Sequence, residues 1–364
     1  MHDRLLAYFA LMNGSYNRVI HFEELIKLSW KVLVHKGVIR RQPLISASAK
    51  APVHHVISLM LRDKVGSVLL DDGLHGHVVE VRDIATKFVE MHATVTSEAE
   101  SGIVEAFLET SVEALGAHHE AHCVPYDTPL MDVCKTFERH SRVVLTKQGV
   151  AVGVFSISDF MMLLRYHPDF KHDFPILPSQ KVEGHDDLLG IKCSVFLGNE
   201  EVVTVQDESP LIDTLTLMVE KGVSGVPVVS NGVPVSVVSL RDFMFYLREA
   251  YEYLQNADER VSDSSMTSER RNSTGSESGL PSVLQNSTIR FISAVRQRDL
   301  QARVPMIDEH TDATIASALS KMMACQIHRV ALTELKSGRT ELRGIITISD
   351  IGKAVARTMS GLEP

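Results

Sequence analysis

The chain has 364 residues, of which 44% are hydrophobic and 23% are charged, and its formal net charge at pH 7 is −9. This composition is that of ordinary globular proteins, and the length is sufficient for two compact domains. The acidic balance excludes a general electrostatic attraction to nucleic acid or to anionic lipid, so we expect neither as a partner. Any site for phosphate must therefore be local.

The cysteines and the apolar segments indicate the cellular compartment in which we expect the protein. The four cysteines, Cys123, Cys134, Cys193 and Cys325, are scattered without a Cys-x-x-Cys pair, so the sequence suggests neither a zinc knuckle nor a dense disulfide framework. No apolar stretch approaches the roughly 20 residues that span a bilayer, and the short run from Leu5 to Met12 predicts a buried helix in an N-terminal extension over 1–41. We expect a soluble protein in a reducing compartment, the cytoplasm or the nucleus, with no membrane partner.

A unit with the order β-α-β-β-α recurs four times along the chain, which predicts an α/β (α+β) fold. Its clearest copy runs from Glu201 to Leu247. There a short strand leads into a helix that ends at Gly222, and two β-branched runs flank an Asn231-Gly232 turn before a second helix begins near Asp242. The copies are expected at residues 42–92, 119–167, 198–250 and 301–360.

Three segments separate the copies. Apolar residues at helical spacing predict a connecting helix within 93–118, and a proline-containing connector is expected at 168–197. The segment 251–300 is rich in Ser, and its part from Glu259 to Ser278 lacks apolar periodicity. We therefore expect a partly disordered insertion there.

Each copy closes on an aspartate that stands between a strand and an apolar helix. A carboxylate in that position is a plausible helix cap or first-turn residue, and for an isolated aspartate this is the simpler interpretation. Recurrence beside a Gly-Val-Pro-Val-Val type of phrase instead favours a shared binding role. The four residues are Asp83, Asp159, Asp242 and Asp350.

Two phrases carry a resemblance to a known family. The segment from Gly222 to Val229, followed by Ser239 to Asp242, resembles the CBS domain. The resemblance implies four CBS repeats, paired first with second and third with fourth into two Bateman modules whose clefts accept adenine nucleotides. The phrase from Ile327 to Val330, followed by Gly344 to Ile351, resembles the last repeat of the gamma regulatory subunit of AMP-activated protein kinases.

The resemblance, together with side-chain chemistry, implies the nucleotide-binding residues. The closing aspartate can accept hydrogen bonds from ribose hydroxyls, nearby hydroxyls can reach ribose or phosphate, and Arg offers a donor fork to phosphate. The candidates are Asp83 in the first copy, Arg142, Ser156, Ser158 and Asp159 in the second, Ser224, Ser239, Arg241 and Asp242 in the third, and His328, Arg329, Thr347, Ser349 and Asp350 in the fourth.

The four sites are not expected to be equivalent. The second copy reads Ser141-Arg142 where the fourth has His328-Arg329, with His140 displaced by one position. The first copy has Arg82 before its aspartate but no hydroxyl.

Catalytic and metal sites have little support. No Walker loop, kinase motif set, His-Glu-x-x-His or nucleophile elbow is present, and adjacent histidines do not share a helix face. The resemblance implies a non-catalytic subunit that needs no cofactor, senses AMP, ADP or ATP, and binds a catalytic alpha-type and a scaffold beta-type kinase subunit. Two alternatives stay open: a stand-alone CBS-domain ligand-binding regulator of another enzyme or transporter, and a scaffold whose nucleotide sites have decayed.

Overall fold

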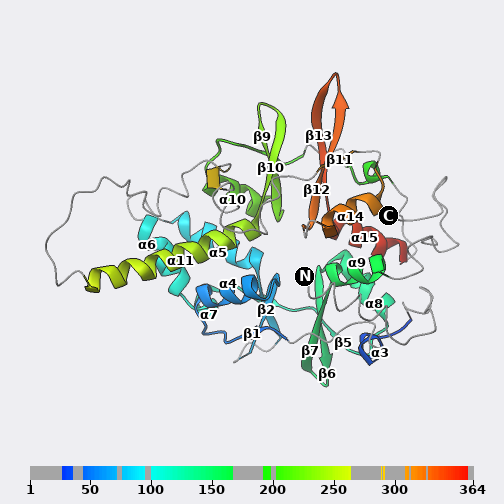
Figure 1. The fold of residues 1–364 in the computed structure, drawn as a ribbon. Coiled ribbons are helices and arrows are strands. Elements are labelled where there is room, and N and C mark those ends of the chain that lie inside the picture. The colour runs from blue at the N-terminus through cyan, green and yellow to red at the C-terminus, as the bar shows by residue number, and fades with distance from the viewer. Residues whose placement is uncertain are drawn as a thin grey trace. The chain divides into compact units, whose positions relative to one another are not determined.

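In the computed structural model, the chain folds into two compact units (Figure 1). Unit 1 comprises Met1–Leu44, Ala121–Val202 and Ile307–Pro364, and unit 2 comprises Ile45–Glu120 and Val203–Met306. Unit 1 therefore contains the second and fourth copies of the repeat, and unit 2 contains the first and third. The structure describes residues 27–35, 44–71, 76–94, 100–166, 192–197, 202–263, 288, 290–291, 308–310, 313–324 and 327–359.

The first copy, in unit 2, forms a four-stranded sheet with the order β1-β2-β3-β4. β1 and β2 are parallel, whereas β2 with β3 and β3 with β4 are antiparallel. The fourth strand is contributed by the segment that follows the connecting helices. The elements are β1 Ser46–Ala47, α4 Val53–Arg62, β2 Ser67–Leu70, β3 His77–Glu80, α5 Val81–His92, α6 Glu100–Glu109, α7 Val112–Leu115 and β4 His119–Glu120.

The third copy has the predicted order and a three-stranded sheet, β10-β9-β8. The residues of the predicted turn, Asn231 and Gly232, both have positive φ, 51° and 78°, as a tight hairpin between right-twisted strands requires. The elements are β8 Val205–Gln206, α10 Leu211–Glu220, β9 Gly225–Ser230, β10 Val233–Ser239 and α11 Leu240–Asp263.

The core of unit 2 joins the helices of the first copy to those of the third. α5 contacts α10, and α11 contacts α4 and α5. The rings of Phe88 on α5 and Phe243 on α11 meet edge-on with centroids 4.9 Å apart, and Phe107 on α6 meets Phe88 at 5.1 Å. Copies that are not adjacent in the chain thus share one hydrophobic core. From the sequence we expected the first copy to pair with the second and the third with the fourth. The members of these pairs belong to different units, and this pairing stays a prediction.

Unit 1 repeats this plan with the second and fourth copies. The sheets have the orders β5-β6-β7 and β11-β12-β13. The elements are α3 Trp30–His35, β5 Cys123–Pro125, α8 Leu130–Lys135, η2 Thr136–Glu138, β6 Arg142–Lys147, β7 Val150–Ser156, α9 Ile157–Tyr166, η5 Cys193–Phe196, β11 Asp308–His310, α14 Ile315–Ala324, β12 Arg329–Lys336, β13 Arg339–Thr347 and α15 Ile348–Met359.

Two glycines fix close contacts in the core of unit 1. A Cβ on Gly352 of α15 would overlap with the Cγ2 atom of Ile157 on α9, so the two helices approach closely at this point. Gly153 of β7 accommodates the Trp30 ring, because a Cβ there would lie 2.9 Å from the ring. Trp30 is buried, so the described end of the N-terminal extension belongs to this core. The helix predicted over Leu5–Met12 lies outside the described residues.

The segments expected as connector and insertion are more ordered at their ends than the sequence indicated. The connector ends in η5, where Cys193 is buried and its N–H donates to Ala313 of the fourth copy at 2.7 Å. The expected insertion begins inside α11, which continues to Asp263. Near its end, Thr288 and Phe291 are buried in unit 2. These two residues are hydrogen-bonded or apolar and extend the core. Residues 264–287, 289 and 292–300 lie outside the described part, so the partly disordered insertion over 251–300 stays a prediction.

Among the described cysteines, Cys123 is exposed, whereas Cys134 and Cys193 are buried, and burial raises the pKa of the Cys134 thiol well above its usual value. In the part of the chain that the structure describes, no helix combines the length and the apolar character needed to cross a membrane.

The close contact between α9 and α15 predicts that replacing Gly352 by alanine lowers the stability, although Gly→Ala in a helix usually raises it. Gly→Ala in an exposed helix stabilises by about 0.5–1 kcal/mol, and Gly102 on α6, with open space around it, is the matched control. Gly352→Ala is expected to destabilise unit 1 by about 1–3 kcal/mol through overpacking against Ile157, lowering the melting temperature by several degrees. Calorimetric melting measures both variants.

Relief by a second substitution distinguishes overpacking from a general sensitivity of α15. Adding Ile157→Ala removes the overlapping Cγ2 atom, so Gly352→Ala should cost less in that background than in the parent. Equal costs in the two backgrounds would contradict the proposed contact.

Candidate functional site

All four copies share one hydrogen-bonded corner where the last strand enters the second helix. The first N–H of that helix donates to the carbonyl of the residue just before the middle strand, and this contact defines equivalent positions independently of sequence. The donor and acceptor residues are Val81 and Gly66 at 3.3 Å, Ile157 and Ser141 at 3.0 Å, Leu240 and Ser224 at 3.1 Å, and Ile348 and His328 at 2.9 Å.

The strand register brings the candidate cations to the same corner. In each copy, the first residue of the middle strand pairs with the residue just before the second helix. The strand register therefore places these two positions opposite each other. The pairs are Ser67 with Glu80, Arg142 with Ser156, Gly225 with Ser239, and Arg329 with Thr347. Among these four pairs, an arginine stands opposite a hydroxyl residue in the second and fourth copies only.

The aspartates are held by the helix start itself. In the fourth copy, Asp350 Oδ2 accepts the backbone N–H of Thr347 at 2.8 Å and its hydroxyl at 2.7 Å. The Asp350 N–H donates back to the Thr347 hydroxyl at 3.1 Å. The same three contacts join Ser156 to Asp159 and Ser239 to Asp242. Each pair is a reciprocal cap, the arrangement that satisfies the free N–H groups of a helix start.

This geometry adds a capping role to Thr347, Ser156 and Ser239. Their hydroxyls donate to the aspartate, and the contact with ribose or phosphate that we expected for them stays a prediction. The capping role that recurrence had led us to set aside is therefore real, and its signal, Ser or Thr three residues before Asp, was present in the sequence. For Asp242 and Asp350 the described contacts all use Oδ2, and both side chains are half-buried. The cap orients the carboxylate without consuming Oδ1.

The copies fall into two types. The second and fourth carry Arg142 or Arg329 at the strand start and Ser158 or Ser349 at the second helical position, just before the aspartate. The first and third carry no cation at the strand start. Each instead has an arginine at the second helical position, and these residues are Arg82 and Arg241. Arg241 lies over the Phe245 ring, 5.9 Å from its centroid.

The structure also resolves the displaced histidine of the second copy. Ser141 and His328 accept the equivalent hydrogen bond, so Ser141 takes the place of His328. His140 instead stacks on His122, with ring centroids 4.3 Å apart and an angle of 5° between the ring planes. The His-Arg pair is therefore complete in the fourth copy and replaced by Ser-Arg in the second.

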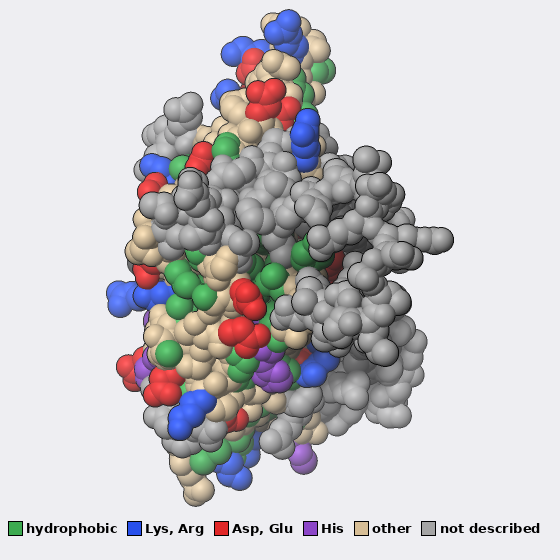
Figure 2. All heavy atoms as spheres, turned by 90° about the vertical axis from the view of Figure 1, so that its left-hand side faces the viewer, with side chains coloured by type: hydrophobic (Ala, Val, Ile, Leu, Met, Phe, Trp, Pro, Cys, Tyr) green, Lys and Arg blue, Asp and Glu red, His purple; other side chains and the backbone are tan. Residues whose placement is uncertain are grey.

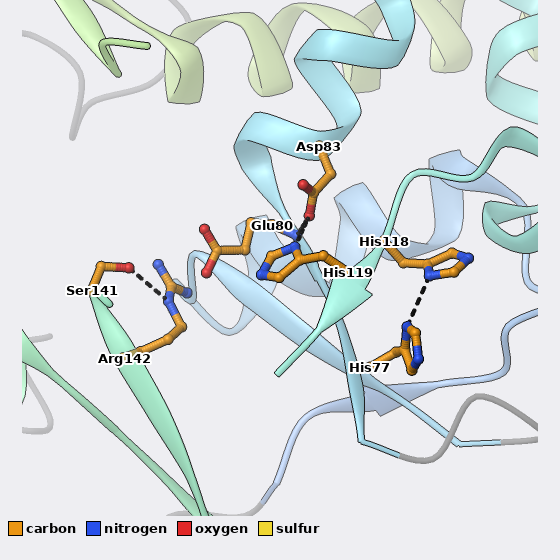
Figure 3. A network of polar contacts seen from close by, with 7 residues as sticks. All are labelled: His77, Glu80, Asp83, His118, His119, Ser141 and Arg142. Atoms are coloured by element: carbon orange, nitrogen blue, oxygen red, sulfur yellow. Dashed lines mark hydrogen bonds and ion pairs between the residues drawn. The ribbon is translucent and has the colours of Figure 1, made fainter. Parts of the chain in front are cut away.

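In the first copy, two residues that the sequence did not single out complete the corner. Glu80 stands in place of the hydroxyl residue and shares a capping box with Asp83, whose Oδ2 accepts the Glu80 N–H at 2.7 Å. The same Oδ2 atom lies 3.0 Å from His119 Nδ1 on β4 (Figure 3). No local pattern announced this contact, because His119 follows Asp83 by 36 residues.

A second histidine contact holds β4 against β3. His77 Nδ1 and His118 Nδ1 lie 3.1 Å apart, so one ring must donate a proton and the other must accept it (Figure 3). Burial lowers the pKa of His118, and the neighbouring His77 lowers it further, against the raising effect of Asp83 and Glu113. Among the described residues, no group of three or more His, Cys, Asp or Glu side chains could hold a metal ion.

Charge on the visible surface is mixed. On the face in Figure 2, the described Lys and Arg side chains are interspersed with Asp and Glu and do not gather into one basic patch. The expectation that single residues such as Arg142 and Arg329 supply the positive charge for a phosphate stays a prediction.

Comparison with known proteins identifies two of the copies. The family model of the CBS domain matches residues 112–166 and 197–249. The chain contains CBS domains. These segments hold the second and third copies, and because the first and fourth copies have the same order of elements and the same corner, we refer to all four as CBS repeats.

Three known proteins are similar to parts or most of the chain. Protein sds23 of Aspergillus clavatus is 26% identical over 236 residues, which cover 61% of this chain but only 37% of that protein. A protein from Methanocaldococcus jannaschii, a candidate archaeal homologue of g-AMPK, is similar in fold, with a TM-score of 0.59, 13% identity, and coverage of 87% of this chain and 98% of that chain. A CBS domain protein from Pyrobaculum aerophilum complexed with AMP has a TM-score of 0.27 and 16% identity, covering 44% of this chain and 89% of that chain.

The His77–His118 contact predicts an acid-sensitive contribution to stability. Because the pKa of His118 is lowered in the folded chain, the unfolded chain binds the proton more readily. The contribution is therefore fully present above about pH 6.5, the ordinary value for histidine, and is lost as the pH falls below it. The melting temperature should therefore fall less between about pH 6.5 and about pH 5.5 in His77→Ala than in the parent. The difference is expected to be less than about 3 °C, because the site is partly exposed.

His55→Ala supplies the control, since His55 is an exposed histidine on α4 of the same unit. If both variants have the parent's pH profile, the histidine contact contributes nothing to acid sensitivity.

Proposed function

We propose that the chain is a non-catalytic, adenine-nucleotide-sensing regulatory subunit of an AMP-activated type of kinase complex. The observation that carries the nucleotide-binding part is the shared corner of CBS repeats 2 and 4, in which an arginine, a hydroxyl and a capped aspartate converge at a helix start. The kinase part is supported by the resemblance of the last repeat to the gamma subunit. The expected cytoplasmic or nuclear location stays a prediction.

The corner offers complementary chemistry to the two polar ends of a nucleotide. The Oδ1 atom of a capped aspartate is an acceptor for ribose hydroxyls, and its orientation is fixed before a ligand arrives, which reduces the entropy cost of binding. Arg142 or Arg329 opposite the cap residue supplies a planar donor fork for phosphate. The helix start adds a favourable partial positive charge. Repeats 2 and 4 thus present both functions within one corner.

The packing of unit 1 gives a route by which binding can change the molecule. α9 and α15 begin at the corners of repeats 2 and 4, and they contact each other where Gly352 meets Ile157. Ile157 is the first residue of α9, two positions before Asp159. A ligand that shifts the start of α9 therefore acts on the contact with α15. Nucleotides with different numbers of phosphates would bias alternative arrangements, which is the population shift that regulation requires.

A second candidate function is a stand-alone regulator that binds adenylates but serves an enzyme other than a kinase. It is kept open by the similarity to protein sds23, whose matched segment spans 61% of this chain. This candidate shares the nucleotide sites with the first and differs from it only in the partner. A scaffold with decayed sites is disfavoured by the intact corners of repeats 2 and 4.

The ribose role of Asp350 can be separated from its capping role. Asp350→Asn retains a carbonyl oxygen for the Thr347 N–H, whereas Asp350→Ala removes the cap, which costs about 1 kcal/mol of stability. Both variants should weaken AMP and adenosine at this corner by roughly ten- to hundredfold, because both lose the carboxylate that accepts ribose hydroxyls. Calorimetric titration and melting are measured together. A loss of stability without a loss of binding would leave Asp350 a cap alone.

The phosphate role of Arg329 has a different ligand dependence. Arg329→Gln should weaken AMP by roughly tenfold or more but leave adenosine, which has no phosphate, nearly unchanged. The matched control is Arg343→Gln, which removes a cation from the same hairpin, where Arg343 pairs with Glu334 at 3.3 Å. Equal effects of the two substitutions on AMP would show that only general charge matters.

The partner is tested by affinity purification of the full chain from its native cell, with and without AMP. The proposal expects a catalytic kinase subunit and a beta-type subunit to be recovered together. Recovery of a different enzyme, combined with nucleotide binding in vitro, would establish the stand-alone regulator instead.

A further inference from the structure

We propose that His119, carried by the connecting strand β4, is a positioning residue that completes the site of CBS repeat 1, in place of the hydroxyl that the other three repeats carry. The inference rests on the proposed nucleotide-binding function and deepens it. It assigns an adenosine-containing ligand to repeat 1 and makes that site dependent on the segment that joins repeat 1 to repeat 2.

The four aspartates provide the comparison. In repeats 2, 3 and 4, Oδ2 accepts a side-chain donor from the cap residue, with oxygen-to-oxygen distances of 2.6, 2.6 and 2.7 Å. In repeat 1 the cap residue is Glu80, whose carboxylate has no proton to donate at neutral pH. The donor to Asp83 Oδ2 comes instead from His119 Nδ1, at 3.0 Å. The same acceptor atom is thus satisfied in all four repeats, but by a different element in repeat 1.

Two further observations show that β4 is built into the site. β4 extends the sheet of repeat 1 to four strands, with His119 paired to Val78 and Glu120 paired to His77, whereas the sheets of the other repeats have three. The adjacent contact between His77 and His118 holds the strand on the far side of the backbone from Asp83 (Figure 3). His119 is about half exposed, so it is placed by the strand and not by burial.

The placement has a consequence for regulation. His119 is followed by Glu120, the last residue of this part of unit 2, after which the chain passes directly into unit 1 and β5. In repeats 2, 3 and 4 the cap residue that donates to the aspartate lies three residues before it in the chain, so the contact is local. In repeat 1, a ligand that engages Asp83 acts on a residue of the connecting segment, and tension on that segment acts on the ligand site. Such coupling between sites is reciprocal.

The hydroxyl donor of the other repeats can be transferred to repeat 1 by substitution, which provides the test. Hydrogen–deuterium exchange of the full chain, read by mass spectrometry at the four helix starts with and without AMP, reports each repeat separately. His119→Ala should make the start of α5 exchange roughly fivefold faster and abolish its protection by AMP, with the other three helix starts unchanged. Restoring a hydroxyl donor with Glu80→Ser in the His119→Ala background should recover both. Glu120→Ala, on the same strand, is the control that should resemble the parent.

The outcomes separate this inference from the proposed function. AMP protection at the start of α5 that persists in His119→Ala, or that Glu80→Ser fails to restore, overturns the role of His119. Protection of repeats 2 and 4 but never of repeat 1 in the parent would also overturn it, since His119 would then serve only as a cap. If AMP protects no helix start in the parent, the proposed function fails, while the exchange rates without nucleotide still decide whether His119 holds Asp83.

Discussion

The hydrogen bonds between each closing aspartate and the residue three positions before it are the constraint on which the candidate sites depend. They end the last strand, begin the second helix and fix a carboxylate at the junction, all with the same atoms. Because the cap also satisfies N–H groups that a helix start leaves free, the arrangement is maintained by folding even where no ligand is bound. A stabilising role and a binding role are therefore not alternatives for these residues.

Around this shared corner, the repeats differ in how positive charge is supplied. Arg142 and Arg329 stand opposite the cap residue, where the strand register holds them in place. Arg82 and Arg241 lie one residue before the aspartate, on the helix itself. The two types are sorted by unit, since unit 1 holds repeats 2 and 4 and unit 2 holds repeats 1 and 3. Each unit thus joins two sites of one type through a common helical core, an arrangement suited to coupling between like sites.

The helical cores also explain why the four copies are not independent. In unit 2, Phe88 and Phe243 belong to different repeats but share one set of aromatic contacts. In unit 1, the absence of a side chain at Gly352 lets α15 approach Ile157 at the start of α9. Protein interiors are close-packed, so a displacement of one helix start is resisted or transmitted by its neighbour. The proposed regulation depends on this rigidity more than on any single ligand contact.

The features that could be predicted from the sequence are those that local chemistry controls. The β-α-β-β-α order, the Asn231-Gly232 turn and the position of each aspartate at a helix start follow from signals within a few residues, and the structure has all of them. Even the cap could have been derived locally, from Ser or Thr three residues before Asp. The arrangements between distant residues became visible only in the folded chain: the packing of repeat 1 against repeat 3, the pairing of Arg329 with Thr347 across the strands, and the hydrogen bond between His119 and Asp83. These depend on which apolar faces pack together and on strand register, and a single sequence carries no local signal for either.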